Sequence, residues 1–311
     1  MHDKNLTVII PVYNSENYIS RCLDCLVNQT LPGMVILVID DASTDNTSRI
    51  VNDYRNRYDN IVFYRNTKNK GPAFCRNRML NLVKTEYVAF LDGDDWLDVD
   101  TYEHAISSFT KGIDIVMWEI TTVWNRSKYE SRYSYNMNST MSSSMSLRLY
   151  SREMVYSNFI SPLLGNKVFR VELLNRNAIR FNSHFFDDDI FVFKSLVHSK
   201  SIRVIKDVHL YYYQHAGSFS RQFSTSVIYA FYQDFSTLKA YLKEQDCWVD
   251  TVQYYYAYYE KCLINLKKQC SNMRSTADSW KALYEALLDG FYKNTDIAEY
   301  VNYCDMDLFP L

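Results

Sequence analysis

Glycine is scarce in this sequence, which has seven in 311 residues, against an average usage of about 7%. The chain contains neither G-x-G-x-x-G nor G-x-x-x-x-G-K-[ST]. These are the loops that bind dinucleotides and nucleoside triphosphates. Their absence argues against a dinucleotide-binding fold of the usual kind and against a P-loop NTPase.

A long apolar run and an excess of one charge are also missing. No stretch approaches the roughly 18 to 20 apolar residues that cross a bilayer, and the start "MHDKNLTVII" has no signal-peptide pattern. Lys and Arg number 34 and Asp and Glu 36, a net charge of -2, so no global field favours nucleic acid or an anionic membrane. We expect a cytoplasmic protein that recognises its partners through local sites.

Cysteines are present but do not form a framework. There are seven, an odd number, scattered from Cys22 to Cys304, which favours reduced thiols over disulfides. Cys22 and Cys25 form a CxxC on an expected helix, but no second CxxC or nearby His pair completes a zinc set. We therefore expect packed thiols rather than metal ligands.

Short apolar runs alternate with amphipathic stretches over the first 120 residues. We expect strands at 6–13, 34–40, 61–66, 87–92 and 114–122. Intervening helices are expected to begin at Asn14 or Ser15, at Asp45 or Thr47, and at Pro72. Strands this continuously apolar are buried on both faces, as in a mostly parallel sheet flanked by helices. The predicted fold class is α/β.

The pattern changes after residue 124. Residues 125–146 are rich in Ser, Asn and Met, which predicts a loop or flap. Beyond it come the stretches "KVFRVELLNRN" (167–177) and "SIRVIKDVHLYYY" (201–213), with a helix expected over 187–198 between them, and the chain is helical in pattern from Thr225 onward. These features predict two parts, an α/β domain over 1–224 and a helical region over 225–311.

Acidic residues follow two of the expected strands. They are Asp40 and Asp41 after the second, and Asp92, Asp94 and Asp95 after the fourth. Ligands of open parallel sheets bind at this edge, and like charges so close together are costly without a cation. Oxygen ligands without His or Cys nearby suit Mg²⁺ or Mn²⁺, with a diphosphate as the expected partner. The alternative is an ordinary turn, with Asp98 and Asp100 capping a helix.

Four ordered stretches carry a family resemblance. "TVIIPVYNSENYISRCLDCLVNQT", "VIDDASTDNT", "NKGPAFCRNRML" and "YVAFLDGDDWLD" resemble the successive motifs of the family 2 glycosyltransferases, which have the GT-A fold. The resemblance continues more weakly through "LLGNKVFRVELL", "FFDDDIFVFKSL" and "LYYYQHAGSFS" to about residue 220. It implies an inverting enzyme that moves a sugar from a nucleotide diphosphate, most often UDP, to a hydroxyl acceptor.

The resemblance also implies a donor site. Its nucleotide-sugar-binding residues would be Pro11, Tyr13, Asp40, Asp41, Arg76, Asp92, Gly93, Lys167 and Ser218. Tyr13 would stack on the base, Asp41 would accept a hydrogen bond from the uracil imide, and Asp40 would support it. Ala42 and Pro72 stand where the family often has glycine, which leaves the nucleotide preference less secure.

The resemblance also implies residues for a metal site and for a general base. Asp92 and Asp94 would form the DxD pair for Mn²⁺ or Mg²⁺, and Asp95 and His215 are further candidate ligands. The family usually has a Glu-Asp pair where this chain has three consecutive acids, "DDD". Asp188 is the expected general base, with Asp187 as its partner and a slip to Asp189 as an alternative. Acids favoured by the helix dipole are the structural alternative.

Two other functions compete with transfer of a sugar. A nucleotidyltransferase would share the fold and metal, but the chain lacks a Gly-rich, basic loop after its first strand. A non-catalytic scaffold, or a homo-oligomer, would use a C-terminal stripe formed by Tyr255, Tyr258, Tyr259, Cys262, Ile264 and Leu266, although such stripes are more often core. Similar proteins usually assemble cell-surface polysaccharide or glycoprotein, some peripherally at the cytoplasmic membrane face, and nothing in the sequence selects the acceptor.

Overall fold

The computed structural model describes residues 6–124, 128–133, 139–142, 162–182, 186–215, 225–248, 251–252, 255–257 and 259–264, with 285 and 289 as single residues. The chain forms two compact units. The first unit comprises Met1–Ser143, Ser161–Ser183 and Phe191–His215, and the second unit comprises Ser144–Ile160, His184–Ile190 and Ala216–Leu311. Each is described by itself below.

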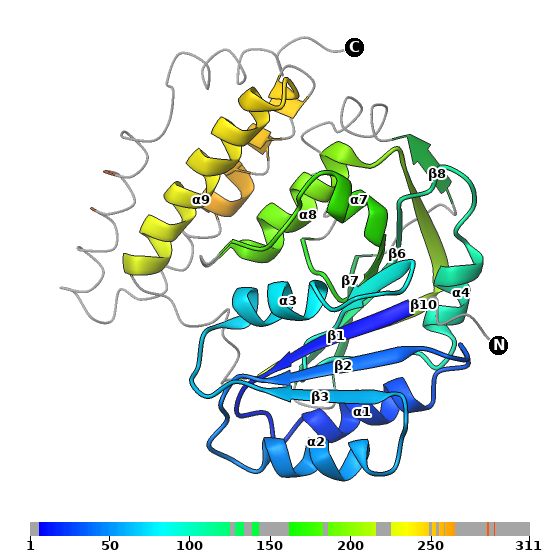
Figure 1. Ribbon diagram of the computed structural model, residues 1–311. Helices are drawn as coiled ribbons and strands as arrows, with labels where there is room; N and C mark the ends of the chain where they lie inside the picture. Colours follow the sequence, from blue (N-terminus) through cyan, green and yellow to red (C-terminus); the bar gives the residue numbers. More distant parts are fainter. Residues whose placement is uncertain are drawn as a thin grey trace. The chain divides into compact units, whose positions relative to one another are not determined.

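Four parallel strands form the first half of the sheet, in the order β3-β2-β1-β4. They are β1 (Leu6–Val12), β2 (Val35–Asp40), β3 (Ile61–Arg65) and β4 (Tyr87–Phe90). The connecting helices are α1 (Ile19–Val27), α2 (Thr47–Arg55) and α3 (Pro72–Leu80). α1 and α2 lie on one face of these strands and α3 on the other (Figure 1). Both faces of β1 are therefore buried, as its apolar sequence predicts.

The second half of the sheet is mixed. β9 (Lys167–Arg170) lies between β4 and β6 (Ile115–Trp124) and pairs antiparallel with both. β10 (Ser201–Gln214) is parallel to β6, and the short β5 (Trp96–Leu97) is antiparallel to β10. α4 (Thr101–Ser107) follows β5, and α7 (Val171–Arg176) follows β9. Because β5 pairs with β10, Trp96, which lies shortly after β4, is opposite Tyr211, 115 positions later in the chain.

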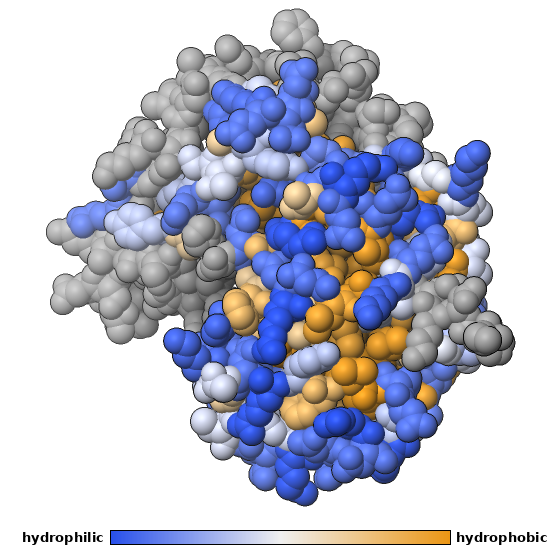
Figure 2. Space-filling model, viewed as in Figure 1, coloured by the Kyte–Doolittle hydropathy of each residue, from blue (hydrophilic) through white to orange (hydrophobic). Residues whose placement is uncertain are grey.

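The core of the first unit fills the space between the sheet and α1 and α2. It includes Val8, Ile10, Ile36, Val38, Cys22, Leu26, Val51 and Tyr54. Cys22, Cys25 and Cys75 are free thiols, and Cys22 and Cys75 are fully buried, as expected for packing residues. On the face seen in Figure 2, apolar side chains gather in the middle, with hydrophilic side chains around and among them.

Two local predictions are wrong. Residues 125–146 are not simply a loop, since β7 (Lys128–Tyr133) pairs with β6 and β8 (Ser139–Ser142) pairs with β10. α1 begins at Ile19 rather than just after Asn14 or Ser15. The Asn14 side chain instead accepts a hydrogen bond from the Thr44 N–H at 2.8 Å, so it connects the β1 and β2 loops.

In the second unit, the aromatic stripe belongs to a helical core. α9 (Thr225–Glu244) starts where the sequence predicts. Its Phe235 ring centroid lies 5.7 Å from that of Tyr255, and its Phe231 centroid 5.2 Å from that of Tyr259. Tyr255 and Tyr259 are both buried and pack the interior, whereas Ile264 of the same stripe is 48% exposed. Tyr258 and Leu266 lie outside the described residues, and none of the described helices is long and apolar enough to cross a membrane.

Candidate active site

Three neighbouring parallel strands bring the predicted donor residues to one edge of the sheet. β1 pairs with β2 so that Val12 lies opposite Asp40, and β4 lies on the other side of β1. The Asp41 N–H donates to the Val12 carbonyl at 2.8 Å. Tyr13, directly after β1, is 48% exposed, so its ring is accessible for the stacking predicted from the sequence.

Asp40 is a structural anchor at the end of β2. Its fully buried carboxylate accepts hydrogen bonds from the Ser43 N–H at 2.9 Å and from the hydroxyls of Ser43 and Ser48. It also forms an ion pair with Arg65, whose Nε is 3.1 Å away. These contacts fix the loop between β2 and α2. They suit the supporting role expected for Asp40.

Asp41 fixes the loop between β3 and α3. Its buried carboxylate accepts hydrogen bonds from the Gly71 N–H at 2.7 Å, from the Lys70 N–H at 2.9 Å and from the Asn66 side-chain amide at 2.7 Å. The two oxygens of a carboxylate offer about four acceptor positions, and these three donors already occupy most of them. Nearby, burial and the charge of Asp41 raise the pKa of the Cys75 thiol to about 12.

The backbone conformation at Ala42 shows what one departure from the family pattern costs. Ala42 has a φ of 64°, a left-handed conformation that an L-residue adopts only at a cost. Glycine, common here in the family, has no such cost. Gly71, with a φ of 85°, supplies the same backbone freedom just before α3.

The three acids after β4 point to different partners. Asp92 pairs with Arg76 at 2.8 Å, Asp94 pairs with the Nε2 atom of His215 at 3.0 Å, and Asp95 accepts the Tyr213 N–H at 2.9 Å. The side chain of Asp92 is 45% exposed and that of Asp94 27%, whereas Asp95 is buried. Asp92 and Asp94 are thus the two acids that an incoming cation can reach.

Burial and mutual repulsion make it costly to ionise all three acids of this loop. Burial, followed by the charge of Asp92, raises the pKa of Asp94. Burial, followed by the charges of Asp94 and Asp92, raises the pKa of Asp95 well above its ordinary value. A divalent cation would offset this cost. The oxygen-rich donor set therefore fits a hard metal ion, although no three His, Cys, Asp or Glu side chains of the described residues are grouped closely enough to hold one.

α1 holds this acidic loop through residues that the sequence analysis missed. Arg21 donates to the Asp94 carbonyl at 2.7 Å, and its guanidinium carbon lies 3.7 Å from the Trp96 ring centroid and 4.6 Å from that of Tyr213. The Tyr18 ring stacks on His215 at 4.4 Å, with its hydroxyl 3.3 Å from Nδ1. The spacing of Tyr18, Arg21 and Cys22 gives them one helix face, the one signal available in the sequence.

The other predicted site residues fall elsewhere. Lys167 is fully buried, and its Nζ donates to the Leu163 carbonyl and the Asn166 side chain, both at 2.7 Å, so it stabilises its own loop. Asp187 and Asp188 begin α8 (Asp187–His198) in the second unit, together with Asp189. Ser218 lies outside the described residues.

Comparison with known proteins agrees with this fold. Residues 7–176 match the family described as Glycosyl transferase family 2. The chain is 32% identical to a poly(ribitol-phosphate) beta-glucosyltransferase of Bacillus spizizenii over 67% of its length and 32% of the relative's. It is 30% identical to the poly(ribitol-phosphate) beta-N-acetylglucosaminyltransferase TarS of Staphylococcus aureus over 66% of its length and 35% of the relative's. The chain thus spans about a third of the length of these curated relatives.

Solved structures give the same result. The S. aureus TarS 1-349 complex with UDP superimposes with a TM-score of 0.60 at 26% identity, covering 76% of this chain and 64% of that one. A mannosyltransferase from Pyrobaculum calidifontis in complex with GDP-Man and Mn²⁺ gives 0.55 at 16% identity, covering 94% and 88%, which supports the fold alone. The predicted GT-A fold is confirmed, and the chain belongs to glycosyl transferase family 2.

Proposed function

We propose that this chain transfers a sugar from a UDP-sugar donor to a hydroxyl group of a cell-wall polymer, with inversion at the anomeric carbon. The observation that carries the proposal is that Asp41, Asp92 and Asp94 follow the carboxyl ends of β2 and β4, the two strands on either side of β1, in a family 2 chain. The UDP and UDP-GlcNAc complexes of TarS support the choice of donor.

Asp92 and Asp94 would contact a Mn²⁺ or Mg²⁺ ion together with the donor diphosphate, and His215, whose Nε2 lies 3.0 Å from Asp94, would position Asp94. When bound, the metal would neutralise the charge that develops on the departing diphosphate. Arg76 lies beside Asp92 and adds a fixed positive charge there. Tyr13, exposed after β1, would stack on the base.

Asp188 is the proposed general base, with Asp187 and Asp189 as neighbours. Asp188 and Asp189 are partly exposed and Asp187 is buried, so Asp188 is accessible to an acceptor hydroxyl. A carboxylate within hydrogen-bond reach of that hydroxyl contributes about 10² to 10⁴ in rate. The acceptor we propose is a polyol-phosphate polymer, because two relatives are named for poly(ribitol-phosphate).

The proposal is tested by incubating the full chain with UDP-glucose or UDP-GlcNAc, poly(ribitol phosphate) and Mn²⁺, with NMR of the product to establish the anomeric configuration. Asp94→Ala should reduce transfer at least a hundredfold, because the leaving group loses its metal. Asp59→Ala, at an exposed position in the turn before β3, is the matched control and should be fully active. Wild-type turnover by the Asp94 variant would refute the metal role.

A further inference from the structure

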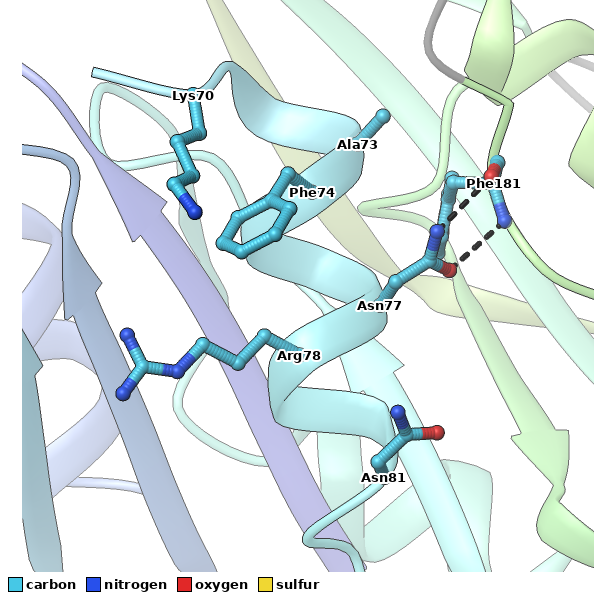
Figure 3. A pocket seen from close by; sticks show the side chains of 7 residues that line it. All are labelled: Lys70, Ala73, Phe74, Asn77, Arg78, Asn81 and Phe181. Carbon is cyan, nitrogen blue, oxygen red and sulfur yellow. Dashed lines mark hydrogen bonds between the residues drawn. The ribbon is translucent and has the colours of Figure 1, made fainter. Parts of the chain in front are cut away.

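A cavity lined by none of the predicted donor residues lies on α3 in the first unit. Its volume is about 620 Å³, and it is lined by two cations, Lys70 and Arg78, two aromatic rings, Phe74 and Phe181, and small or amide side chains of α3 (Figure 3). No acidic residue lines it. In a chain with a net charge of -2, this is a local concentration of positive charge.

The cations and the exposed ring lie on one side of the helix. Phe74 and Arg78 are four residues apart in α3 and share a face of it, and Lys70 lies just before the helix. Figure 3 shows the three side chains on one side of the helix, while Asn77 points to Phe181 on the other. Phe74 is 40% exposed, and the Lys70 ammonium lies 4.2 Å from its ring centroid.

The floor of the cavity is rigid. The Asn77 side chain exchanges two hydrogen bonds with the Phe181 backbone, each 2.9 Å long. The Phe181 ring in turn stacks on Phe191 with a centroid separation of 4.0 Å. The cavity is therefore already formed, and binding there requires little reorganisation.

The two cations connect to the expected donor site. Arg78 donates to the Asn66 side-chain oxygen, and the amide of Asn66 donates to Asp41 at 2.7 Å. The backbone N–H of Lys70 also donates to Asp41. A ligand in the α3 cavity would thus lie next to the loop that fixes Asp41, whereas Arg76 points to the other side of the helix, toward Asp92.

We propose that the α3 cavity binds the phosphodiester backbone of an elongated polyol-phosphate polymer at a point removed from sugar transfer. Two cations in a cavity without an acidic residue can each make a charge-assisted contact to a phosphate, and a polymer with a phosphate in every repeat supplies more than one. The exposed Phe74 face suits the C–H surface of a polyol, and Asn81 offers hydrogen bonds to its hydroxyls. This proposal rests on the acceptor class proposed above.

The test compares the Lys70→Gln, Phe74→Ala double variant, which leaves the Arg78 contact to Asn66 intact, with a control at an exposed cation and an exposed apolar side chain elsewhere, Lys111→Gln and Val99→Ala. The α3 variant should raise the KM for long poly(ribitol phosphate) about tenfold and weaken its salt dependence. Its kcat, its KM for the UDP-sugar and its KM for a single-repeat acceptor should match those of the control. Phe74→Ala alone should also raise the KM for the polymer.

Equal KM values for the long polymer in the α3 and control variants would overturn the proposal. So would weakened UDP binding in the α3 variant, because the cations would then act through Asp41. If the wild-type chain transfers no sugar, binding of fluorescent poly(ribitol phosphate), with dextran as the uncharged comparison, still tests the cavity. Loss of that binding in the α3 variant alone would support the cavity even though the proposed function had failed.

Discussion

At the scale of single residues, Arg21 does much to organise the candidate site, although the family resemblance assigns it no role. It lies on α1, donates to the loop after β4 and packs against both Trp96 of β5 and Tyr213 of β10. Burial lowers its pKa, but arginine stays protonated and keeps its charge. A planar guanidinium can contact both rings and still donate to the loop, which a compact ammonium cannot do as well.

Replacing Arg21 with lysine should therefore impair the acidic loop while preserving charge. We expect kcat to fall at least tenfold, because Asp94 loses its anchor, and unfolding in urea to become easier by about 1–3 kcal/mol. Steady-state kinetics and urea titration measure the two effects. Arg49→Lys, on an α2 side chain that is 69% exposed, is the control and should change neither; an Arg21→Lys enzyme as active as that control would contradict the role.

The acids at the strand ends could be predicted from the sequence, whereas the roles of side chains whose partners are distant in the sequence could not. Asp40, Asp41, Asp92 and Asp94 follow strands, and strand ends gather at one edge whatever the details. Arg21 and Tyr18 find partners 73 and 197 positions away, and no local pattern encodes that distance. Lys167 has a motif position but a buried side chain, which only the packing of the β9 loop determines.

At the scale of elements, the end of β1 limits what the acidic loop can contain. A Cβ built on Gly93 would lie 2.9 Å from the Cγ1 atom of Val12, closer than real contacts allow. Valine is β-branched and stiff at χ1, so it cannot easily turn away. The glycine thus permits β1 and the loop after β4 to approach each other.

Gly93→Ala should cost about 1–3 kcal/mol in the free energy of unfolding, through overpacking, and should reduce transfer by displacing Asp92 and Asp94. Val12→Ala removes the obstructing methyl groups, so the double variant should lose less than the sum of the two single variants. Denaturant titrations of all four chains complete the cycle. Strict additivity would show that Val12 is not the cause.

Some of the strands and helices could be predicted from the sequence, and others could not. The strands of the first half were predictable because burial on both faces demands continuous apolar sequence, and α8 begins at the predicted Asp187. The antiparallel insertion of β9 between β4 and β6 leaves no such mark. β7 and β8 are polar and Ser-rich, so only their pairing with β6 and β10 distinguishes them from a loop.

At the scale of the whole molecule, the proposed boundary near residue 224 separates the catalytic region from the C-terminal helices, yet one helix belongs to both compact units. Residues 187–190 of α8 group with the second unit and residues 191–198 with the first. The start of α8 is held by α9, because the Phe186 N–H donates to the buried Asp234 carboxylate at 3.2 Å and the Phe186 ring lies 5.5 Å from that of Phe231. The proposed base therefore depends on the C-terminal helices.

A chain that ends after Ser224 should consequently bind UDP with unchanged affinity but transfer sugar at least a hundredfold more slowly, because Asp188 loses this support while Asp41 and Asp92 keep theirs. Calorimetry with UDP and a transfer assay separate the two properties. In the full chain, Asp234→Asn removes the charge that holds the Phe186 N–H and should slow transfer without weakening UDP binding. Normal transfer by both chains would mean that the C-terminal helices do not position the base and that residues 1–224 are sufficient for sugar transfer.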